Sequence, residues 1–299
     1  MKLKILFCYL AVSIVWGTGF MFTKLALLSF PPFWLAGIRF LIAGSLMMGW
    51  CLWKKLPFPK NPEDYLKISI LSFLFLTVGN GFLVWSQQVL PSGLAAIICA
   101  ALPLWMAFFT ILSLGLQKTG LKTLGGLITG FTGMVVLVYP KIKGVETDSL
   151  VSLFVLFLAT VGWATGSFWM NWIGKRYDII VFTALEMLIA SAMLLLAALL
   201  GPPLIISQIT ATSLMSLSYL ILIASCLAFT AFFYLFSHAN PVWASTYAYI
   251  NPVIAVYLGW LILHEPLTWN ILTGAIIILS GVAMVNWENY KKAINLRDS

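Results

Sequence analysis

Ten apolar runs, each close in length to the roughly 20-residue helix that crosses a bilayer, constrain this chain more than any other feature. None alternates apolar and polar residues with a period of two, as the strands of a membrane barrel do, so we predict helices. The composition agrees, because 62% of the residues are hydrophobic and 9% are charged, which is too apolar for a soluble domain. We therefore predict an all-α integral membrane fold with ten transmembrane helices at 5–27, 33–53, 65–88, 92–114, 121–139, 150–174, 179–200, 213–237, 242–263 and 267–287.

The lysines and arginines indicate how the chain is oriented. With the N-terminus in the cytoplasm, thirteen of the seventeen basic residues fall in cytoplasmic segments, among them Lys54, Lys55 and Lys60 between the second and third runs. The external segments hold Lys141 and Lys143, so the positive-inside rule is obeyed. We expect a multi-pass protein of the cell membrane with both termini in the cytoplasm. The net charge of +8 then reflects orientation, and we expect no nucleic-acid partner.

The sequence repeats itself at an offset of about 147 residues. Trp16 corresponds to Trp163, Thr18 to Thr165, and "LIAG" at 41–44 to "LIAS" at 188–191. We divide the chain into a first repeat at 1–143, a second repeat at 148–290 and a cytoplasmic tail at 291–299. Because each repeat holds five runs, an odd number, the second repeat must enter the membrane from the opposite side. Such inverted repeats suit a transporter whose central site lies between two alternating gates.

Several segments resemble the EamA-type transporters of the drug/metabolite transporter superfamily. The matching stretches, in order along the chain, are "WGTGFMFTKLAL", "PPFWLAGIRFLIAG" and "NPVIAVYLGWLILHEPLTWNILTGAIIILSGV". Two more, "GNGFLVWSQQVLPSGLAAIICAALPLW" and "ALEMLIA", are similar to the YedA-type branch of that family. The resemblance implies a ten-helix exporter of small metabolites, driven by protons or by exchange.

Two positions depart from the pattern that this resemblance implies. An acidic residue is expected after "VWS", where this chain has Gln87, and the first-half counterpart of the glutamate in "HEPLT" is Gln117. A proton carrier is therefore missing at both positions. Any coupling to protons must depend on the acid that remains inside a predicted span, Glu186.

Three charged residues lie inside predicted spans, where a charge must face the bundle interior, pair or be neutralised: Lys24, Arg39 and Glu186. Glu186 corresponds to Arg39 in the repeat. Two interpretations of Glu186 stay open, namely a proton-coupling or substrate-binding acid, and a structural ion pair or hydrogen bond between helices. Arg39 is interpreted as a structural clamp, with a substrate contact as the alternative. Lys24 either lines a cavity or extends its ammonium toward the membrane surface.

Pro103 and Pro252 fall near the middle of the fourth and ninth predicted spans. Proline lacks an N–H, so a carbonyl one turn earlier loses its helical partner at mid-depth. The matched placement in both halves favours a helix break or gate over an ordinary packing kink. Asn251 adds a side-chain amide at the same depth.

Aromatic and polar side chains at mid-depth would line a substrate cavity if their helices meet, and would otherwise be ordinary packing residues. The candidates are Trp16, Thr18, Lys24, Trp85, Gln87, Trp105, Trp163, Tyr234, Tyr247 and Asn251. A pocket of this kind would suit zwitterionic or moderately apolar solutes. Glycines of the fifth and tenth spans indicate close helix packing, with contact between two copies in a homodimer as the alternative.

Together these patterns favour a secondary active transporter that exports small metabolites, above all amino acids or related amphipathic compounds, by alternating access. Its partners would be the substrate, the lipid bilayer and protons as the coupling ion. We expect no enzyme activity, metal or cofactor, because the sequence shows no catalytic constellation, metal-ligand spacing or P-loop. The alternatives are an exchanger of phosphorylated or nucleotide-linked sugars, with Lys24 and Arg39 holding the phosphate, and a non-transporting receptor or scaffold.

Overall fold

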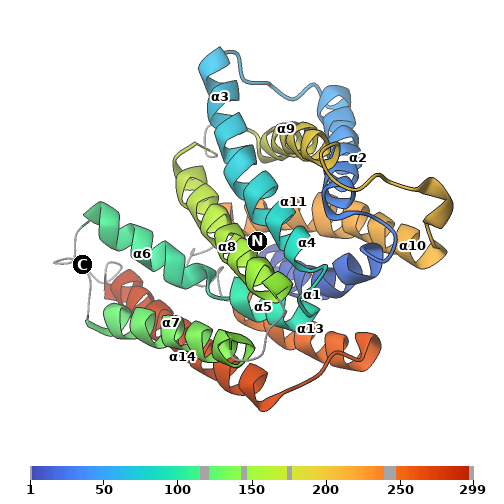
Figure 1. Ribbon diagram of the computed structural model, residues 1–299. Coiled ribbons are helices and arrows are strands. Elements are labelled where there is room, and N and C mark those ends of the chain that lie inside the picture. Colours follow the sequence, from blue (N-terminus) through green and yellow to red (C-terminus); the bar gives the residue numbers. More distant parts are fainter. Residues whose placement is uncertain (1, 115–120, 143–146, 174–176, 239–246, 296–299) are drawn as a thin grey trace.

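The computed structural model describes residues 2–114, 121–142, 147–173, 177–238 and 247–295 (Figure 1). These segments are helical, and no strand occurs within them. Seven of the described helices are long and apolar enough to cross a membrane, and shorter apolar helices lie at Thr123–Val136, Tyr247–Leu263 and Trp269–Met284. The chain is therefore an all-helical, multi-pass membrane protein, as the apolar runs predict.

The first half of the chain begins with two long helices, continues with two interrupted spans and ends with one long helix. Its elements are α1 (Lys2–Ala26), α2 (Pro32–Trp53), α3 (Pro62–Leu71), the π-helix η1 (Ser72–Gly81), α4 (Phe82–Ser86), α5 (Ser92–Cys99), α6 (Leu102–Leu114) and α7 (Leu121–Ile142).

The second half follows a similar order. Its elements are α8 (Thr147–Ile173), α9 (Ile179–Ala198), the short 3-10 helix η4 (Ile206–Gln208), α10 (Ala211–Tyr219), the π-helix η5 (Leu220–Leu227), α11 (Ala228–His238), α13 (Tyr247–Leu263) and α14 (Trp269–Asn295). Local chemistry fixes several starts: the Asp178 carboxylate accepts from the backbone N–H of Ile180 at 2.9 Å and so caps α9.

Each predicted apolar run is helical where the structure describes it, but the fourth run is not one helix. It breaks at Ala100 and Ala101, so Pro103 lies in the first turn of α6, a position where its missing N–H costs nothing. A helix break thus lies directly before Pro103, and the gate role expected of this residue stays a prediction. Pro252, in contrast, lies inside α13. Residues 242–246 of the ninth run, the 144–146 boundary between the repeats and the last four residues of the tail lie outside the described part.

Two π-helices interrupt spans of the two halves at matching places. η1 continues α3 into α4, and η5 continues α10 into α11, and they begin 148 residues apart. A π-helical turn shifts the i→i−4 hydrogen-bond ladder and is frequent at functional sites. The sequence analysis does not predict them, because no proline or glycine pattern that it used marks their start.

Glycines allow the closest helix contacts. α2 packs along α9, where a Cβ on Gly37 would lie 2.7 Å from the Leu195 side chain. α7 packs along α14, where a Cβ on Gly281 would lie 2.4 Å from the backbone nitrogen of Gly130. The two pairs are visible in Figure 1, α2 with α9 and α7 with α14. Close approach at glycine is the expected way to join helices in lipid, where there is little hydrophobic force between them.

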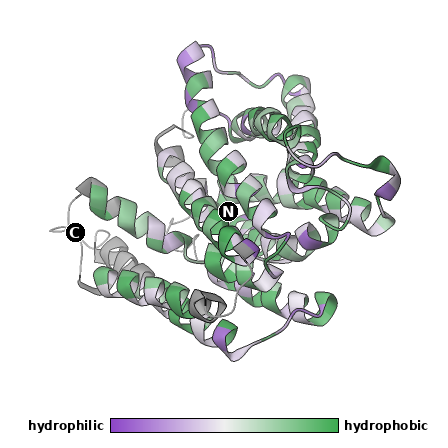
Figure 2. Ribbon diagram, viewed as in Figure 1, coloured by the Kyte–Doolittle hydropathy of each residue, from purple (hydrophilic) through white to green (hydrophobic). Residues whose placement is uncertain are grey.

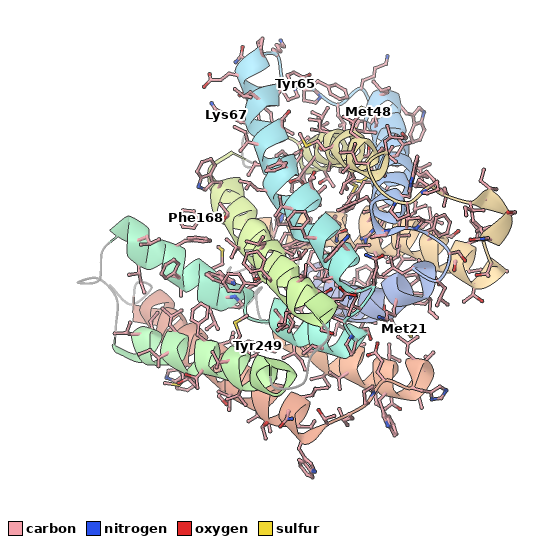
Figure 3. The ribbon with its side chains drawn as sticks, in the orientation of Figure 1. Met21, Met48, Tyr65, Lys67, Phe168 and Tyr249 are labelled. Atoms are coloured by element: carbon pink, nitrogen blue, oxygen red, sulfur yellow. The ribbon has the colours of Figure 1, made fainter. Side chains whose placement is uncertain are left out.

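Side-chain character follows from the membrane setting. Apolar residues cover most of the helix surfaces, and hydrophilic ones gather near helix ends and connections (Figure 2). Tyr65 and Lys67, for example, lie toward the N-terminal end of α3, where Lys67 pairs with Glu63 at 2.8 Å (Figure 3). One buried core joins α1, α2, η1, α9 and the α10–α11 segment, and a second joins α5, α6, α7 and α14. The space between these cores contains the candidate site.

Candidate substrate cavity

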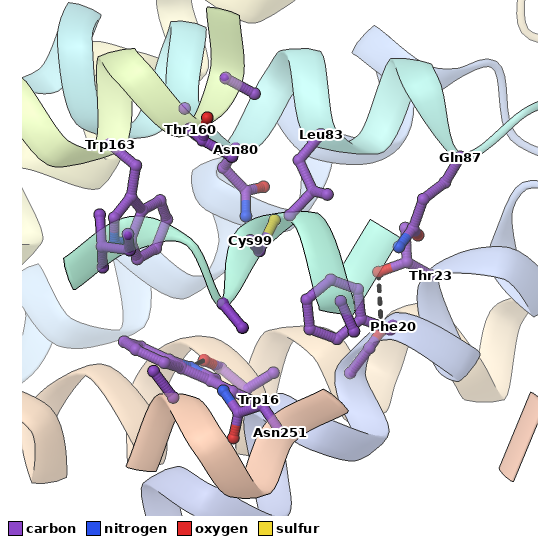
Figure 4. A pocket seen from close by; sticks show the side chains of 18 of the residues that line it. Trp16, Phe20, Thr23, Asn80, Leu83, Gln87, Cys99, Thr160, Trp163 and Asn251 are labelled. Carbon is purple, nitrogen blue, oxygen red and sulfur yellow. Dashed lines mark hydrogen bonds between the residues drawn. The ribbon is translucent and has the colours of Figure 1, made fainter. Parts of the chain in front are cut away.

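A cavity of about 110 Å³ lies between elements of both halves of the chain (Figure 4). In the same measure a single buried water needs roughly 10–15 Å³, so the cavity has room for several waters or one compact solute. α1, α2, η1, α4, α5 and α6 contribute residues from the first half, and α8, η5, α11 and α13 from the second. The described lining includes Trp16, Phe20, Thr23, Arg39, Asn80, Leu83, Gln87, Cys99, Thr160, Trp163, Phe229, Tyr247 and Asn251.

An aromatic cluster forms one wall of this cavity. The rings of Trp16 and Trp163, which correspond in the predicted repeat, meet edge to face with centroids 5.8 Å apart. Trp16 also contacts Phe229 at 5.2 Å and Tyr247 at 5.4 Å, and its indole Nε1 donates to the carbonyl of Ala224 at 3.3 Å. The wall is thus fixed by ring packing and by one hydrogen bond to the π-helix η5.

Three buried amides add polar atoms to the lining. Asn251 is satisfied when its amide nitrogen donates to the carbonyls of Ser13 at 2.8 Å and Tyr247 at 3.2 Å. Gln87 is 1% exposed, and within the described part of the chain neither Oε1 nor Nε2 has a hydrogen-bond partner. Asn80, on η1, has an Oδ1 atom that is also buried without a hydrogen-bond partner among the described residues. Buried polar atoms without partners are costly, so their presence at a cavity points to a ligand or water that satisfies them.

Arg39 supplies the only charge among the described residues that line the cavity. The side chain is 5% exposed, and its Nε donates to Ser225 Oγ on η5 at 2.8 Å. The guanidinium carbon lies 5.1 Å from the ring centroid of Phe40. The residue therefore joins α2 to the π-helix of the other half and also faces the cavity. Both of its predicted roles, clamp and substrate contact, are compatible with this position.

Glu186 lies away from Arg39. It is 1% exposed, is not part of the described cavity lining, and has an Oε2 atom without a partner among the described residues. α2 and α9 run antiparallel, because Gly37 packs on Leu195 and Gly44 on Leu188. Arg39 and Glu186 are consequently about 10 Å apart along the helix axes, given a rise of about 1.5 Å per residue. They form no ion pair with each other; the ion pair within the described residues joins Lys67 to Glu63.

Lys24 also takes a place other than the cavity wall. Its Nζ donates to the carbonyls of Gln87 at 2.7 Å, Leu90 at 3.1 Å and Gln88 at 3.3 Å. These carbonyls belong to the turn between α4 and α5, where the C-terminal end of α4 favours a cation. The ammonium therefore holds this turn closed rather than extending to the membrane surface.

Four further predicted residues are not among the described lining residues. Thr18 shares a 2.6 Å hydrogen bond with the Tyr219 hydroxyl. Trp105 lies behind the cavity, where its Nε1 donates at 3.1 Å to Thr160 Oγ1, so it positions a lining residue instead of being one. Trp85 lies about 200° around the helix from Gln87, at about 100° per residue, and so faces a different way. Tyr234 lies on a separate groove near the start of α1.

Some lining residues escape the sequence analysis. Phe20 and Thr23 follow Trp16 on α1 at helical spacing, and Cys99 and Thr160 carry small side chains that no motif marks. Asn80 gave a usable signal, because it is an amide in the middle of an apolar run, in the stretch "GNG". Only the structure shows that η1 turns this amide toward the same space as Gln87.

Known proteins resemble this chain over nearly its whole length. The uncharacterized inner membrane transporter YedA of Escherichia coli strain K12 is 31% identical over 255 residues, which cover 83% of this chain and 79% of YedA. The uncharacterized transporter YvbV of Bacillus subtilis is 30% identical, covering 92% of this chain and 89% of YvbV. A protein of known crystal structure superposes with a TM-score of 0.66 at 17% identity, covering 95% of this chain and 96% of the other, which shows a shared fold alone.

The family comparison matches the chain twice. The EamA-like transporter family aligns with residues 3–139 and again with residues 150–287, which together span most of the sequence and leave a gap near the predicted boundary of the repeats. The helical architecture, the cavity between the halves and these matches agree: the chain is a membrane transporter that belongs to the EamA-like transporter family.

Proposed function

We propose that this chain is a secondary active transporter that moves small metabolites, most favourably amino acids or related amphipathic compounds, out of the cell by alternating access. The observation that carries the proposal is the buried cavity, which takes lining residues from both halves and contains amide atoms of Gln87 and Asn80 without protein partners. A scaffold would have no use for unsatisfied polar atoms around such a space.

We propose further that the chain crosses the membrane ten times as two inverted repeats. Support comes from the two family matches, from the π-helices at corresponding places, and from the packing partners. α1 of the first half packs on the α10–α11 segment of the second, and α8 of the second half packs on the α3–α4 segment of the first, so the two contacts between the halves are counterparts of each other. The distribution of lysine and arginine in the sequence supports cytoplasmic termini in the cell membrane.

The π-helices η1 and η5 would be the flexible elements of alternating access. Both border the cavity, through Asn80 on η1 and Ala224 on η5, and both lie where one long span must bend. On the side that the proposed topology places outside the cell, Lys24 holds the turn after α4, and Glu265 holds the start of α5. These contacts support a conformation that is closed toward the outside.

The other functions suggested by the sequence have less support. An exchanger of phosphorylated sugars would need a second cation beside Arg39, but the ammonium of Lys24 is engaged by three carbonyls and is not among the described lining residues. Proton coupling through Glu186 remains part of the proposal, because that carboxylate is buried between helices that must move. A homodimer is a separate proposal that the glycine pattern does not support, because those glycines join α7 to α14 within one chain.

Flux into vesicles tests the proposal, and two glycines give a matched pair of variants. A Cβ at Gly19 or at Gly49 would meet nothing within 4 Å, but Gly19 lines the cavity and Gly49 does not. In proteoliposomes screened with labelled amino acids, monocarboxylates and sugar phosphates, Gly19→Leu should abolish the flux of a transported solute, and Gly49→Leu should preserve it. Ligand binding without flux in the unmodified protein would instead indicate a receptor.

A further inference from the structure

We propose that the cavity recognises its solute by a carboxylate group, which the guanidinium of Arg39 binds. This inference rests on the proposed transport function and names the chemical class of its substrate. The class is a small monocarboxylate with an apolar remainder, including an amino acid as one member.

The charge of Arg39 is not balanced by the rest of the described cavity lining. Arg39 is 5% exposed and lines the cavity, and the described lining contains no aspartate, glutamate or second cation. Glu186 is distant along the antiparallel helices, and no carboxylate of a described residue lies within 4.0 Å of Arg39. A buried cation without a counter-ion is costly, so an anionic solute would supply the missing partner.

Arg39 also keeps hydrogen-bond donors that a ligand can use. Its Nε is taken by Ser225 Oγ, but neither Nη1 nor Nη2 has a hydrogen-bond partner among the described residues. Ser225 thus fixes the guanidinium at one edge and leaves the other nitrogens for a ligand. Two parallel N–H groups match the two oxygens of a carboxylate, which is the geometry that arginine binds best.

The remaining cavity wall selects the rest of the solute. The aromatic wall of Trp16 and Trp163 favours an apolar side chain, and the cavity of about 110 Å³ limits it to a compact one. Gln87 Oε1 and Asn80 Oδ1 are neutral amide oxygens, which can accept a hydrogen bond from an ammonium or hydroxyl but cannot neutralise a cation. An amine without a carboxylate would therefore meet the positive charge of Arg39 unopposed, and a phosphate would keep a second negative charge unpaired.

Three probes that share the same branched five-carbon chain test this assignment. 4-Methylpentanoate carries only the carboxylate, leucine carries both charges, and 3-methylbutylamine carries only the amine. Binding is measured on the full-length purified protein by thermal stabilisation, with glucose 6-phosphate as the phosphate arm. We expect 4-methylpentanoate and leucine to stabilise the protein, and the amine and the sugar phosphate to leave the melting temperature unchanged.

Variants then connect the effect to Arg39. Arg39→Gln should weaken binding of both carboxylates about 10- to 100-fold, as expected for the loss of charge-assisted hydrogen bonds. Lys54→Gln removes an exposed cation outside the cavity and should leave the affinity unchanged. If Arg39→Gln does not fold, the order of the three probes on the unmodified protein still decides the matter.

The outcomes separate this inference from the proposed function. Stabilisation by the amine equal to that by 4-methylpentanoate, or full affinity in Arg39→Gln, would overturn the carboxylate assignment. The carboxylate assignment would also be overturned if none of the probes binds while another solute shows flux that Gly19→Leu blocks. In that case the transport proposal would stand. If no solute in the vesicle screen shows flux, the transport proposal itself is wrong.

Discussion

Glu265 caps the helix that begins at Ser92, although the two residues are far apart in the sequence. Its Oε1 accepts a hydrogen bond from the Ser92 backbone N–H at 2.7 Å, and its Oε2 accepts one from Ser92 Oγ at 2.9 Å. The Gly93 N–H donates to the same carboxylate at 3.2 Å. A carboxylate in this position satisfies backbone donors of the first turn and opposes the positive end of the helix dipole. The connection between α13 and α14 is thereby joined to the start of α5.

Replacing Glu265 should destabilise the protein. Glu265→Ala removes three hydrogen bonds and leaves two N–H groups at the start of α5 without an acceptor, for a loss of about 2 kcal/mol in the free energy of unfolding. The measurement is denaturant or thermal unfolding of the protein in detergent. Glu63→Ala is the control, because the Glu63–Lys67 pair is on the surface and should contribute less than about 1 kcal/mol. Equal effects of the two changes would refute the capping role.

A methyl group at the contact between α7 and α14 should force the two helices apart. A Cβ on Gly281 would lie 2.4 Å from the backbone nitrogen of Gly130, and backbone cannot move aside as a flexible side chain can. Gly281→Ala should therefore cost about 1–3 kcal/mol of stability. At Gly49, where a Cβ meets nothing within 4 Å, the same substitution should be neutral or stabilise by about 0.5–1 kcal/mol through the unfolded state. A neutral result at Gly281 would mean that the helices separate at no cost.

The helices could be predicted from the sequence because lipid leaves the backbone little choice. A run of about 20 apolar residues must satisfy its N–H and C=O groups internally, so its hydropathy alone predicts a helix. The break at Ala100 and Ala101 and the two π-helices could not be predicted in this way. The break and the π-helices change which carbonyl each backbone N–H bonds, but they do not change how apolar the segment is. Pro103 lies two residues after the break at Ala100 and Ala101.

The cavity could be predicted only in part, because hydropathy says how deep a residue lies but not which way it faces. Trp16, Gln87, Trp163, Tyr247 and Asn251 lie on its lining, as do residues that no motif marked. Amides were a good guide, since a buried amide must face something polar or remain unsatisfied, and both predicted amides, Gln87 and Asn251, line the cavity. Other polar and aromatic residues were a weaker guide, because Thr18 and Lys24 bond elsewhere and, in a chain that is 15% aromatic, aromatic residues also form ordinary packing contacts.

Gln87→Met should raise stability and lower transport together. The amide of Gln87 is buried with both polar atoms unpaired by described residues, so an apolar side chain of similar size should stabilise the protein by about 1 kcal/mol. A ligand that bonds this amide would lose affinity at the same time. The measurements are the melting temperature and vesicle uptake of the same preparation. Gln88→Met, at an exposed neighbour, should change neither. Lower stability in Gln87→Met would show that the amide is satisfied in the folded protein.

Glu186→Gln should separate coupling from transport. Glutamine keeps the shape of the side chain but carries neither the charge nor an exchangeable acid proton, so uptake driven by a pH gradient should be lost if Glu186 carries the coupling proton. Exchange of substrate across the vesicle membrane at equal pH needs no net proton movement and should continue. The folded protein should be no less stable, because an unpaired carboxylate in a buried site is costly. Glu63→Gln, at the exposed end of α3, is the control for a lost carboxylate. Unchanged gradient-driven uptake in Glu186→Gln, together with a lower melting temperature, would make Glu186 a structural residue that holds α9 in place.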